Sequence, residues 1–191
     1  MNELVFDEEE HKYTYRGRTV PGVTSVLEGV GISDFSMVPK DILQDAMDLG
    51  TSVHLTCEYY DKEILDVIPE VAEPYLKQWM AFCDLYNPEW VDIESKVFCD
   101  RFFYAGTLDR VALMNGELWI IDIKTGGKSK AHRLQTSAYE KCWLKDKRKK
   151  IRRMCVHLTE TKFTIEEFKN KTDFDLFLAA LTTYNFKKGN I

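Results

Sequence analysis

The spacing of apolar residues along the chain predicts where helices form. The segment PKDILQDAMDLGTSVHLTCEYYDK, which starts at Pro39, places its apolar residues three and four positions apart, as one buried helical face requires. Residues 71–86 follow the same rule and stop at Asn87-Pro88, because the residue before a proline is biased away from the helical conformation. Further helices are predicted over 23–29, 130–145 and 172–184, the last beginning near a Thr-Asp cap.

Runs rich in β-branched and aromatic residues predict the strands. LVFD and KYTYRG, on either side of the turn-like EEEH, predict an N-terminal β-hairpin that ends near Gly17 and Pro21-Gly22. WVDIESKVFC, GTLDRVALM and ELWIIDIKT predict strands in the middle of a sheet, and MCVHLT and KFTIEEF predict two more. The order of these elements predicts an α/β fold in which helices pack on a mixed central β-sheet.

Length and composition fit one globular domain. A chain of 191 residues, with 45% hydrophobic and 30% charged residues, can bury a core without disulfides or metals. We expect a single domain over residues 1–191. Residues 1–88 would hold the hairpin and the first helices, 89–160 the central strands with the candidate chemistry, and 161–191 a final strand and helix.

Neither a signal sequence nor a membrane span is visible in the sequence. The N-terminal MNELVFDEEEHKY has no basic segment followed by an apolar one, and no uncharged apolar run is long enough to cross a membrane. The five cysteines are scattered without a C-x-x-C pair, which argues against a disulfide framework or a zinc site. We therefore expect a cytoplasmic protein with buried thiols and no membrane partner.

Charge is unevenly distributed along the chain. The net charge is -5, yet the run KDKRKKIRR at 145–153 contributes +6 and leaves -11 for the remainder. Such a run is either a solvated helix end or a local phosphate-binding patch. In the second case Lys147, Arg148 and Lys149 are the candidate contacts to a polyanion, which would have to bind locally.

The Asn115-Gly116 dipeptide fixes the register of two strands. Asn-Gly between apolar runs is a strong signal for a two-residue hairpin turn. If Met114 pairs with Glu117, then Asp109 falls directly opposite Asp122, with Cβ atoms about 4.5 to 5.5 Å apart. Two carboxylates would then face each other on adjacent strands.

The residues around this carboxylate pair are apolar, so a positive charge is needed to compensate for the two negative charges. The residues around Asp122 are apolar on both faces of the strand, as in a buried central strand. Magnesium and manganese prefer carboxylate oxygens, and Lys124 leans to the same face as Asp122 by the period of two. The alternative, an Asp-Lys ion pair on a solvated sheet edge, fits such an apolar strand poorly.

Several motifs together resemble the RecB-like branch of the PD-(D/E)XK nucleases. They are YAGTLDRV, WIIDIKTG and LQTSAYEKCW, in this order along the chain. Their matching residues are Gly106, Asp109, Asp122, Lys124, Gln135 and Tyr139. His54 in GTSVH resembles the upstream helical histidine of this branch, and the opening hairpin followed by VTSVL is similar to phage-type members. The resemblance implies a restriction-endonuclease-like core.

The resemblance also implies a metal site for Mg²⁺ or Mn²⁺. Its ligands would be Asp109, Asp122, the backbone carbonyl of Ile123 and the imidazole of His54, a residue type that otherwise is more often found at a surface or in a core. Glu58, one helical turn beyond His54, and Glu94, on the preceding strand, are candidate supporting residues. Each of the two is about as well explained as an ordinary carboxylate.

The implied reaction is hydrolysis of DNA phosphodiester bonds. Lys124 would orient the attacking water and stabilise the developing charge, while Gln135 and Tyr139, four residues apart on a helix, would position the substrate backbone. The alternative for the last two is an ordinary helix with one core tyrosine. The cysteine triplet of iron-sulfur members is missing, so no cluster is expected, and there is no G-x-x-x-x-G-K-[ST] motif for an attached ATPase.

The leading functional hypothesis is a small exonuclease that degrades DNA from free ends, of the phage or mobile-element recombination and repair type. A single-strand-annealing or recombination protein is a candidate partner, and the sequence does not fix the oligomeric state. The alternatives are a structure-selective endonuclease on the same fold and a non-catalytic DNA-binding module. Asp109, Asp122 and Lys124 together argue against the binding module, because binding alone needs no buried charges of this kind.

Overall fold

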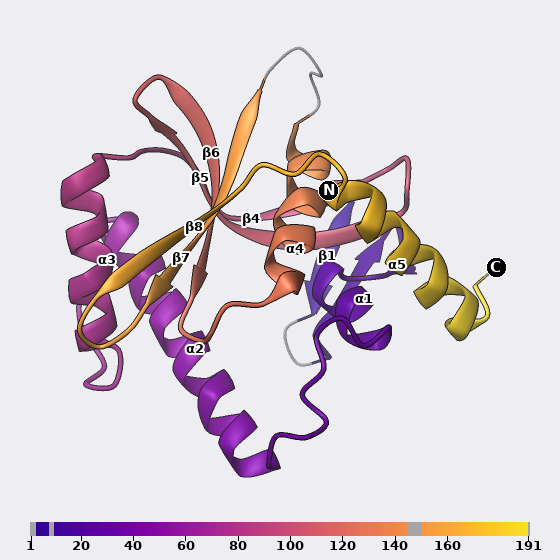
Figure 1. The fold of residues 1–191 in the computed structure, drawn as a ribbon, viewed down its shortest axis with the longest axis horizontal. Helices are drawn as coiled ribbons and strands as arrows, with labels where there is room; N and C mark the ends of the chain where they lie inside the picture. The colour runs from indigo at the N-terminus through magenta and orange to yellow at the C-terminus, as the bar shows by residue number, and fades with distance from the viewer. Residues whose placement is uncertain (1–2, 8–9, 145–149, 191) are drawn as a thin grey trace.

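A computed structural model describes residues 3–7, 10–144 and 150–190 (Figure 1). Its elements follow the chain in the order β1 Leu4–Asp7, β2 Lys12–Tyr15, β3 Arg18–Val20, α1 Val23–Gly29, α2 Lys40–Asp61, α3 Glu73–Tyr86, β4 Glu89–Cys99, β5 Tyr104–Met114, β6 Glu117–Lys124, α4 Lys130–Trp143, β7 Ile151–Leu158, β8 Phe163–Phe168 and α5 Asp173–Lys188.

A five-stranded mixed sheet forms the centre of the molecule, with strand order β4-β5-β6-β7-β8. Only the β6–β7 pair is parallel among the described strands, and helix α4 provides the crossover between them. β5 and β6 meet at Asn115 and Gly116, which both have positive φ, as the predicted two-residue hairpin turn requires. The predicted mixed α/β architecture is confirmed.

Helices cover both faces of this sheet (Figure 1). Helices α1, α4 and α5 pack on one face around residues such as Leu108, Ile120 and Phe177. Helices α2 and α3 pack on the other around Trp79 and Ile121, among others. Because β6 is buried on both faces, its continuous apolar sequence follows from its place in the middle of the sheet. No helix in the described part of the chain is long and apolar enough to span a membrane.

The N-terminal hairpin is part of a small three-stranded sheet. β3 adds to the predicted pair β1–β2, with Tyr13 opposite Val20. Three residues are too few to show a strand pattern in the sequence, so β3 was not predicted. Buried Tyr13 and Val20 contact Ala105 of β5, which attaches the small sheet beside the central one.

The helix boundaries depart little from the prediction. α1 matches 23–29, whereas α3 begins at Glu73 and α5 continues to Lys188. Pro39 is the cap residue before α2 rather than its first helical residue. Thr172 caps α5, but its side chain makes no capping hydrogen bond.

Candidate functional site

Asp109 lies where strands β5 and β6 separate. Their paired register runs from Met114–Glu117 to Arg110–Ile121, as the Asn-Gly turn predicts, and ends there. Beyond it, the backbone N–H of Ile123 donates to Asp109 Oδ2 over 2.7 Å. The predicted direct pairing of Asp109 with Asp122 is therefore replaced by a bond from the Asp109 side chain to the β6 backbone.

Asp122 and Lys124 form an ion pair on the buried strand β6. Asp122 is 1% exposed, and its Oδ2 lies 2.7 Å from Lys124 Nζ. Its second oxygen, Oδ1, is buried and has no hydrogen-bond partner among the described residues. Burial lowers the pKa of Lys124, but the nearby carboxylates of Asp122 and Asp109 outweigh burial and raise it. Lys124 is therefore a fixed cation beside a carboxylate oxygen that lacks a partner.

His54 and Glu94 approach Asp109 from two different elements. His54 is on α2, and its Nδ1 lies 3.5 Å from Asp109 Oδ2. Glu94 is on β4, which pairs with β5, and its backbone has a positive φ of 49°. One ligand atom from each of His54, Glu94 and Asp109 lies within 4.8 Å of the other two. The fold thus gathers three of the residues that the sequence singled out.

A buried arginine holds Glu94 in place. Arg110, with 0% side-chain exposure, donates to Glu94 Oε1 over 2.8 Å and to Asp61 Oδ2 over 2.6 Å. Trp79 Nε1 donates to the other oxygen of Asp61 over 2.9 Å. Burial, followed by the Asp109 carboxylate, raises the pKa of Glu94 to about 8 despite the opposing effect of Arg110. Sequence reasoning missed Arg110 and Asp61, although an arginine inside an apolar strand was a visible signal.

These residues suit a hard divalent cation. Carboxylates with one imidazole are the donors that magnesium and manganese accept, and the unpartnered Asp122 Oδ1 is an atom that a cation would satisfy. Asp122 itself stands outside the group of His54, Glu94 and Asp109 found in the described part of the chain. Glu58 is also outside it and binds Lys62 Nζ over 2.5 Å.

Gln135 and Tyr139 face the sheet from α4. Gln135 Nε2 donates to the Tyr139 hydroxyl over 3.0 Å, and Tyr139 is only 3% exposed. An ideal Cβ on Gly106 would lie 2.5 Å from Tyr139 Cε1. Gly106 is therefore needed for the close approach of the α4 tyrosine to β5. Tyr139 is a core residue here, which is the alternative that the sequence left open, and Gln135 stays half-buried beside it.

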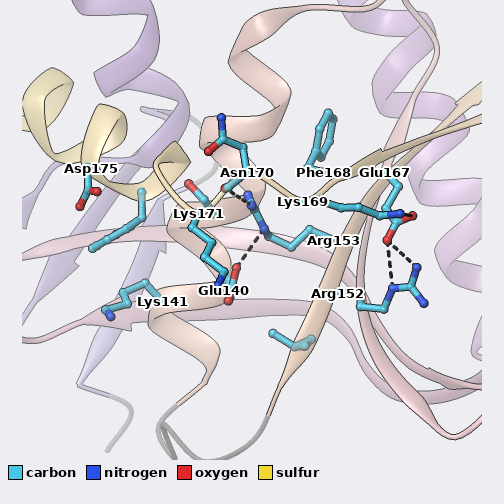
Figure 2. A pocket seen from close by; sticks show the side chains of 13 residues that line it. Glu140, Lys141, Arg152, Arg153, Glu167, Phe168, Lys169, Asn170, Lys171 and Asp175 are labelled. Carbon is cyan, nitrogen blue, oxygen red and sulfur yellow. Dashed lines mark hydrogen bonds and ion pairs between the residues drawn. The ribbon is translucent and has the colours of Figure 1, made fainter.

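The basic run divides into two parts. Lys147, Arg148 and Lys149 lie outside the described residues. Arg152 and Arg153 belong to β7 rather than to a solvated helix end, and both are ion-paired. They line a cavity of about 630 Å³. Figure 2 shows Arg152 paired to Glu167 and Arg153 to Glu140. Because these cations already have acidic partners, the cavity is a weaker anion site than its arginines suggest.

Comparison with known proteins identifies a family for this chain. The family model described as "PD-(D/E)XK nuclease superfamily" matches residues 38–184, which include every element from α2 to most of α5. No curated protein matches the sequence. Among 16 matching chains of solved structures is one described as "Crystal structure of SSO0001", with 18% identity, a TM-score of 0.38 and 74% coverage of each chain.

Proposed function

The chain belongs to the PD-(D/E)XK nuclease superfamily, and from this premise we propose that it hydrolyses phosphodiester bonds of DNA with the help of a divalent metal. One observation carries this proposal. The buried Asp122 Oδ1, unpaired within the described residues, lies on the same carboxylate that holds Lys124. A buried carboxylate oxygen without a hydrogen bond makes the fold less stable, and a bound cation would compensate for this loss.

The proposed metal ligands are His54, Asp109, Asp122 and the backbone carbonyl of Ile123, with Glu94 as a supporting carboxylate. A bound Mg²⁺ or Mn²⁺ polarises a phosphate oxygen and makes a coordinated water more acidic. Asp109 contributes in a second way, because its bond to the Ile123 N–H fixes the β6 backbone beside the site. The ligand side chains are thus positioned by strands and a helix rather than by loops.

Lys124 is the proposed catalytic cation. Its neighbouring carboxylates keep it protonated, so it can donate to the water or to a phosphate oxygen and stabilise negative charge that develops during the reaction. Asp122 holds the ammonium group in place at 2.7 Å. Gln135 is a candidate contact to the substrate backbone, together with Lys147, Arg148 and Lys149, whereas buried Tyr139 orients Gln135.

We propose that the substrate is DNA with free ends and that the enzyme is an exonuclease of a phage or mobile-element recombination or repair system, acting in the cytoplasm with a single-strand-annealing or recombination protein. The resemblance of the opening hairpin and of the Asp122-to-Tyr139 motifs to RecB-like and phage-type members supports this finer proposal.

Cleavage of end-labelled linear DNA against covalently closed circles tests the proposal. Both substrates are incubated with Mg²⁺, Mn²⁺ or chelator, using wild type, Lys124→Ala and the control Lys162→Ala, whose exposed lysine lies in the turn before β8. We expect only linear DNA to be lost, only with metal, and about 100- to 1000-fold more slowly with Lys124→Ala.

Each of the other outcomes would contradict a part of this proposal. Cleavage of circles would show an endonuclease on the same fold. Metal-independent DNA binding without cleavage under any metal would show a binding module. Equal rates for Lys124→Ala and Lys162→Ala would remove Lys124 from the reaction centre.

A further inference from the structure

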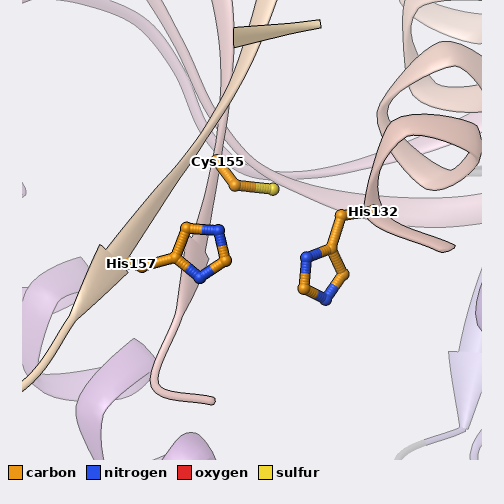
Figure 3. Close-up of side chains that lie close together, drawn as sticks. All are labelled: His132, Cys155 and His157. Atoms are coloured by element: carbon orange, nitrogen blue, oxygen red, sulfur yellow. The ribbon is translucent and has the colours of Figure 1, made fainter. Parts of the chain in front are cut away.

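A second cluster of metal-binding side chains lies beside the candidate catalytic site. His132 comes from the first turn of α4, and Cys155 and His157 come from β7. The parallel register of β6 and β7 places Cys155 next to Asp122 and His157 next to Lys124. One ligand atom from each of the three lies within 4.8 Å of the other two, and Figure 3 shows the thiol and both imidazoles pointing toward one another.

The cluster is buried and incompletely satisfied. Cys155 is 0% and His157 5% exposed. His132 is half-buried, and its Nδ1 is a buried nitrogen that finds no hydrogen-bond partner in residues 3–7, 10–144 and 150–190. A buried polar atom without a partner is unfavourable, and in a native protein it often marks a ligand site. His132 therefore has a nitrogen available for an ion.

Both ring nitrogens of His157 face oxygen atoms. Its Nδ1 lies 3.2 Å from the Gly126 carbonyl oxygen and its Nε2 lies 3.3 Å from Glu166 Oε2. A neutral imidazole carries one N–H, so its other nitrogen presents a lone pair to an oxygen. Metal binding through one nitrogen, with the other donating to a carboxylate or carbonyl, is the usual arrangement of histidine ligands.

We propose that His132, Cys155 and His157 bind one borderline-soft divalent cation, such as Zn²⁺, at a site separate from the one around Asp109. Two imidazoles and a thiolate select such ions over magnesium, which prefers oxygen. A tetrahedral zinc site has ligand atoms roughly 3.3 to 3.8 Å apart, which is compatible with three atoms that lie within 4.8 Å of one another. A water molecule would complete the tetrahedral coordination.

Binding changes the contact between the two sites. Cys155 Sγ donates to Asp122 Oδ2 over 3.4 Å. When a bond forms between Sγ and the cation, the thiol proton leaves to solvent, and the thiolate can no longer donate to Asp122. The ligands come from α4 and β7 and meet only in the fold. The sequence lacks the close cysteine spacing of common zinc motifs, so it gave no sign of this site.

Titration of the full reduced chain with Co²⁺, after chelator treatment, tests the site directly. We expect a thiolate-to-cobalt charge-transfer band and the d–d bands of tetrahedral cobalt that saturate at one equivalent, whether or not Co²⁺ also binds at the Asp109 site, and we expect Zn²⁺ to remove both signals. Cys155→Ser should abolish the charge-transfer band. His132→Gln, a change at a half-buried residue that the fold should tolerate, should weaken binding at least tenfold, and Glu166→Gln should weaken it about 10- to 100-fold.

Two control variants separate this site from its neighbours. Cys142→Ser alters another buried cysteine, and Asp109→Asn alters the candidate catalytic site, so both should keep the full cobalt spectrum. A charge-transfer band that survives Cys155→Ser, or one that is lost in Cys142→Ser or Asp109→Asn, overturns the proposal. So does the absence of a tetrahedral cobalt spectrum in the folded wild-type protein, or unchanged affinity in His132→Gln.

Discussion

At the scale of single residues, the site depends on close contacts that each tolerate little change. Gly106 shows this most directly, because it allows the Tyr139 ring to lie against β5. Tyr139 in turn accepts the hydrogen bond that orients Gln135. The glycine of the Gly-x-x-Asp motif is thus required because a larger residue would collide with Tyr139, and this reason was not visible in the sequence alone.

Replacing Gly106 with alanine should displace Tyr139. The new Cβ would lie 2.5 Å from Cε1 of a ring that is 3% exposed, so the ring or β5 must shift. We expect a loss of about 1 to 3 kcal/mol in the free energy of unfolding and slower DNA cleavage. Urea unfolding measures the first effect. Gly127→Ala is the matched control, since no described atom lies within 4 Å of its added Cβ, and equal losses in the two variants would refute the steric explanation.

Glu94 should make the metal-free protein less stable as the pH rises. Its pKa is raised to about 8, against an ordinary value of 4.5, so between these values the folded state holds a proton that the unfolded chain has lost. The free energy of unfolding therefore falls with increasing pH across this window. We expect Glu94 to account for on the order of 1 to 3 kcal/mol of this fall.

Urea unfolding in chelator between about pH 5 and about pH 8 checks this expectation. Glu94→Gln removes the titrating group, so its stability should vary less with pH across the window. The explanation fails if wild type and Glu94→Gln show the same pH dependence.

At the scale of secondary-structure elements, the features that depend on neighbouring residues in the sequence could be predicted, whereas those that depend on tertiary contacts could not. Asn115-Gly116 gave the β5–β6 register, and Asn87-Pro88 gave the end of α3, where Asn87 has the positive φ of 44°. Both depend on residues adjacent in the chain. The separation of β5 and β6 at Asp109 could not be predicted, because it comes with a hydrogen bond from the Ile123 backbone to the Asp109 side chain, which neither the strand pattern nor the turn signal encodes.

Arg110 links three elements through buried charges, and its loss should be costly. It connects β5 to Asp61 at the end of α2 and to Glu94 on β4. Arg110→Ala leaves Asp61, whose side chain is 1% exposed, without its cation, so we expect a loss of roughly 3 to 5 kcal/mol in the free energy of unfolding. Lys77→Ala breaks an exposed ion pair on α3 and should change stability far less when both are measured by urea unfolding. Similar losses in the two would show that burial of the Arg110 pair has no special effect.

At the scale of the whole molecule, the central strands bring two groups of potential metal ligands close together. Asp109 meets His54 of α2, whereas Asp122 meets Cys155, and α4 brings His132 to the same cluster. The strands therefore place a hard-donor group next to a softer group, and Asp122, a proposed ligand of the first, contacts Cys155 of the second. Such an arrangement requires that both helical layers stay fixed to the sheet, and the C-terminal helix contributes to this through its first turn.

Asp173, at the start of α5, fixes this helix to α4 and β7. Its carboxylate binds Arg133 of α4, and its Oδ2 lies 3.1 Å from Arg153 of β7. Since Asp173 is 1% exposed and Arg153 5%, Asp173→Ala leaves a buried cation with one partner fewer, and we expect a loss of about 3 kcal/mol or more in the free energy of unfolding.

Asp175→Ala provides the matched control for Asp173, measured by the same thermal or urea unfolding. Both aspartates lie in the first turn of α5, where a negative charge interacts favourably with the helix dipole, but Asp175 is exposed. Any loss common to the two variants therefore reports the dipole, and the excess in Asp173→Ala reports the buried ion pairs. If the two losses are equal, the contacts with Arg133 and Arg153 do not stabilise the fold, and hydrophobic packing of residues such as Phe177 alone holds α5 on the sheet.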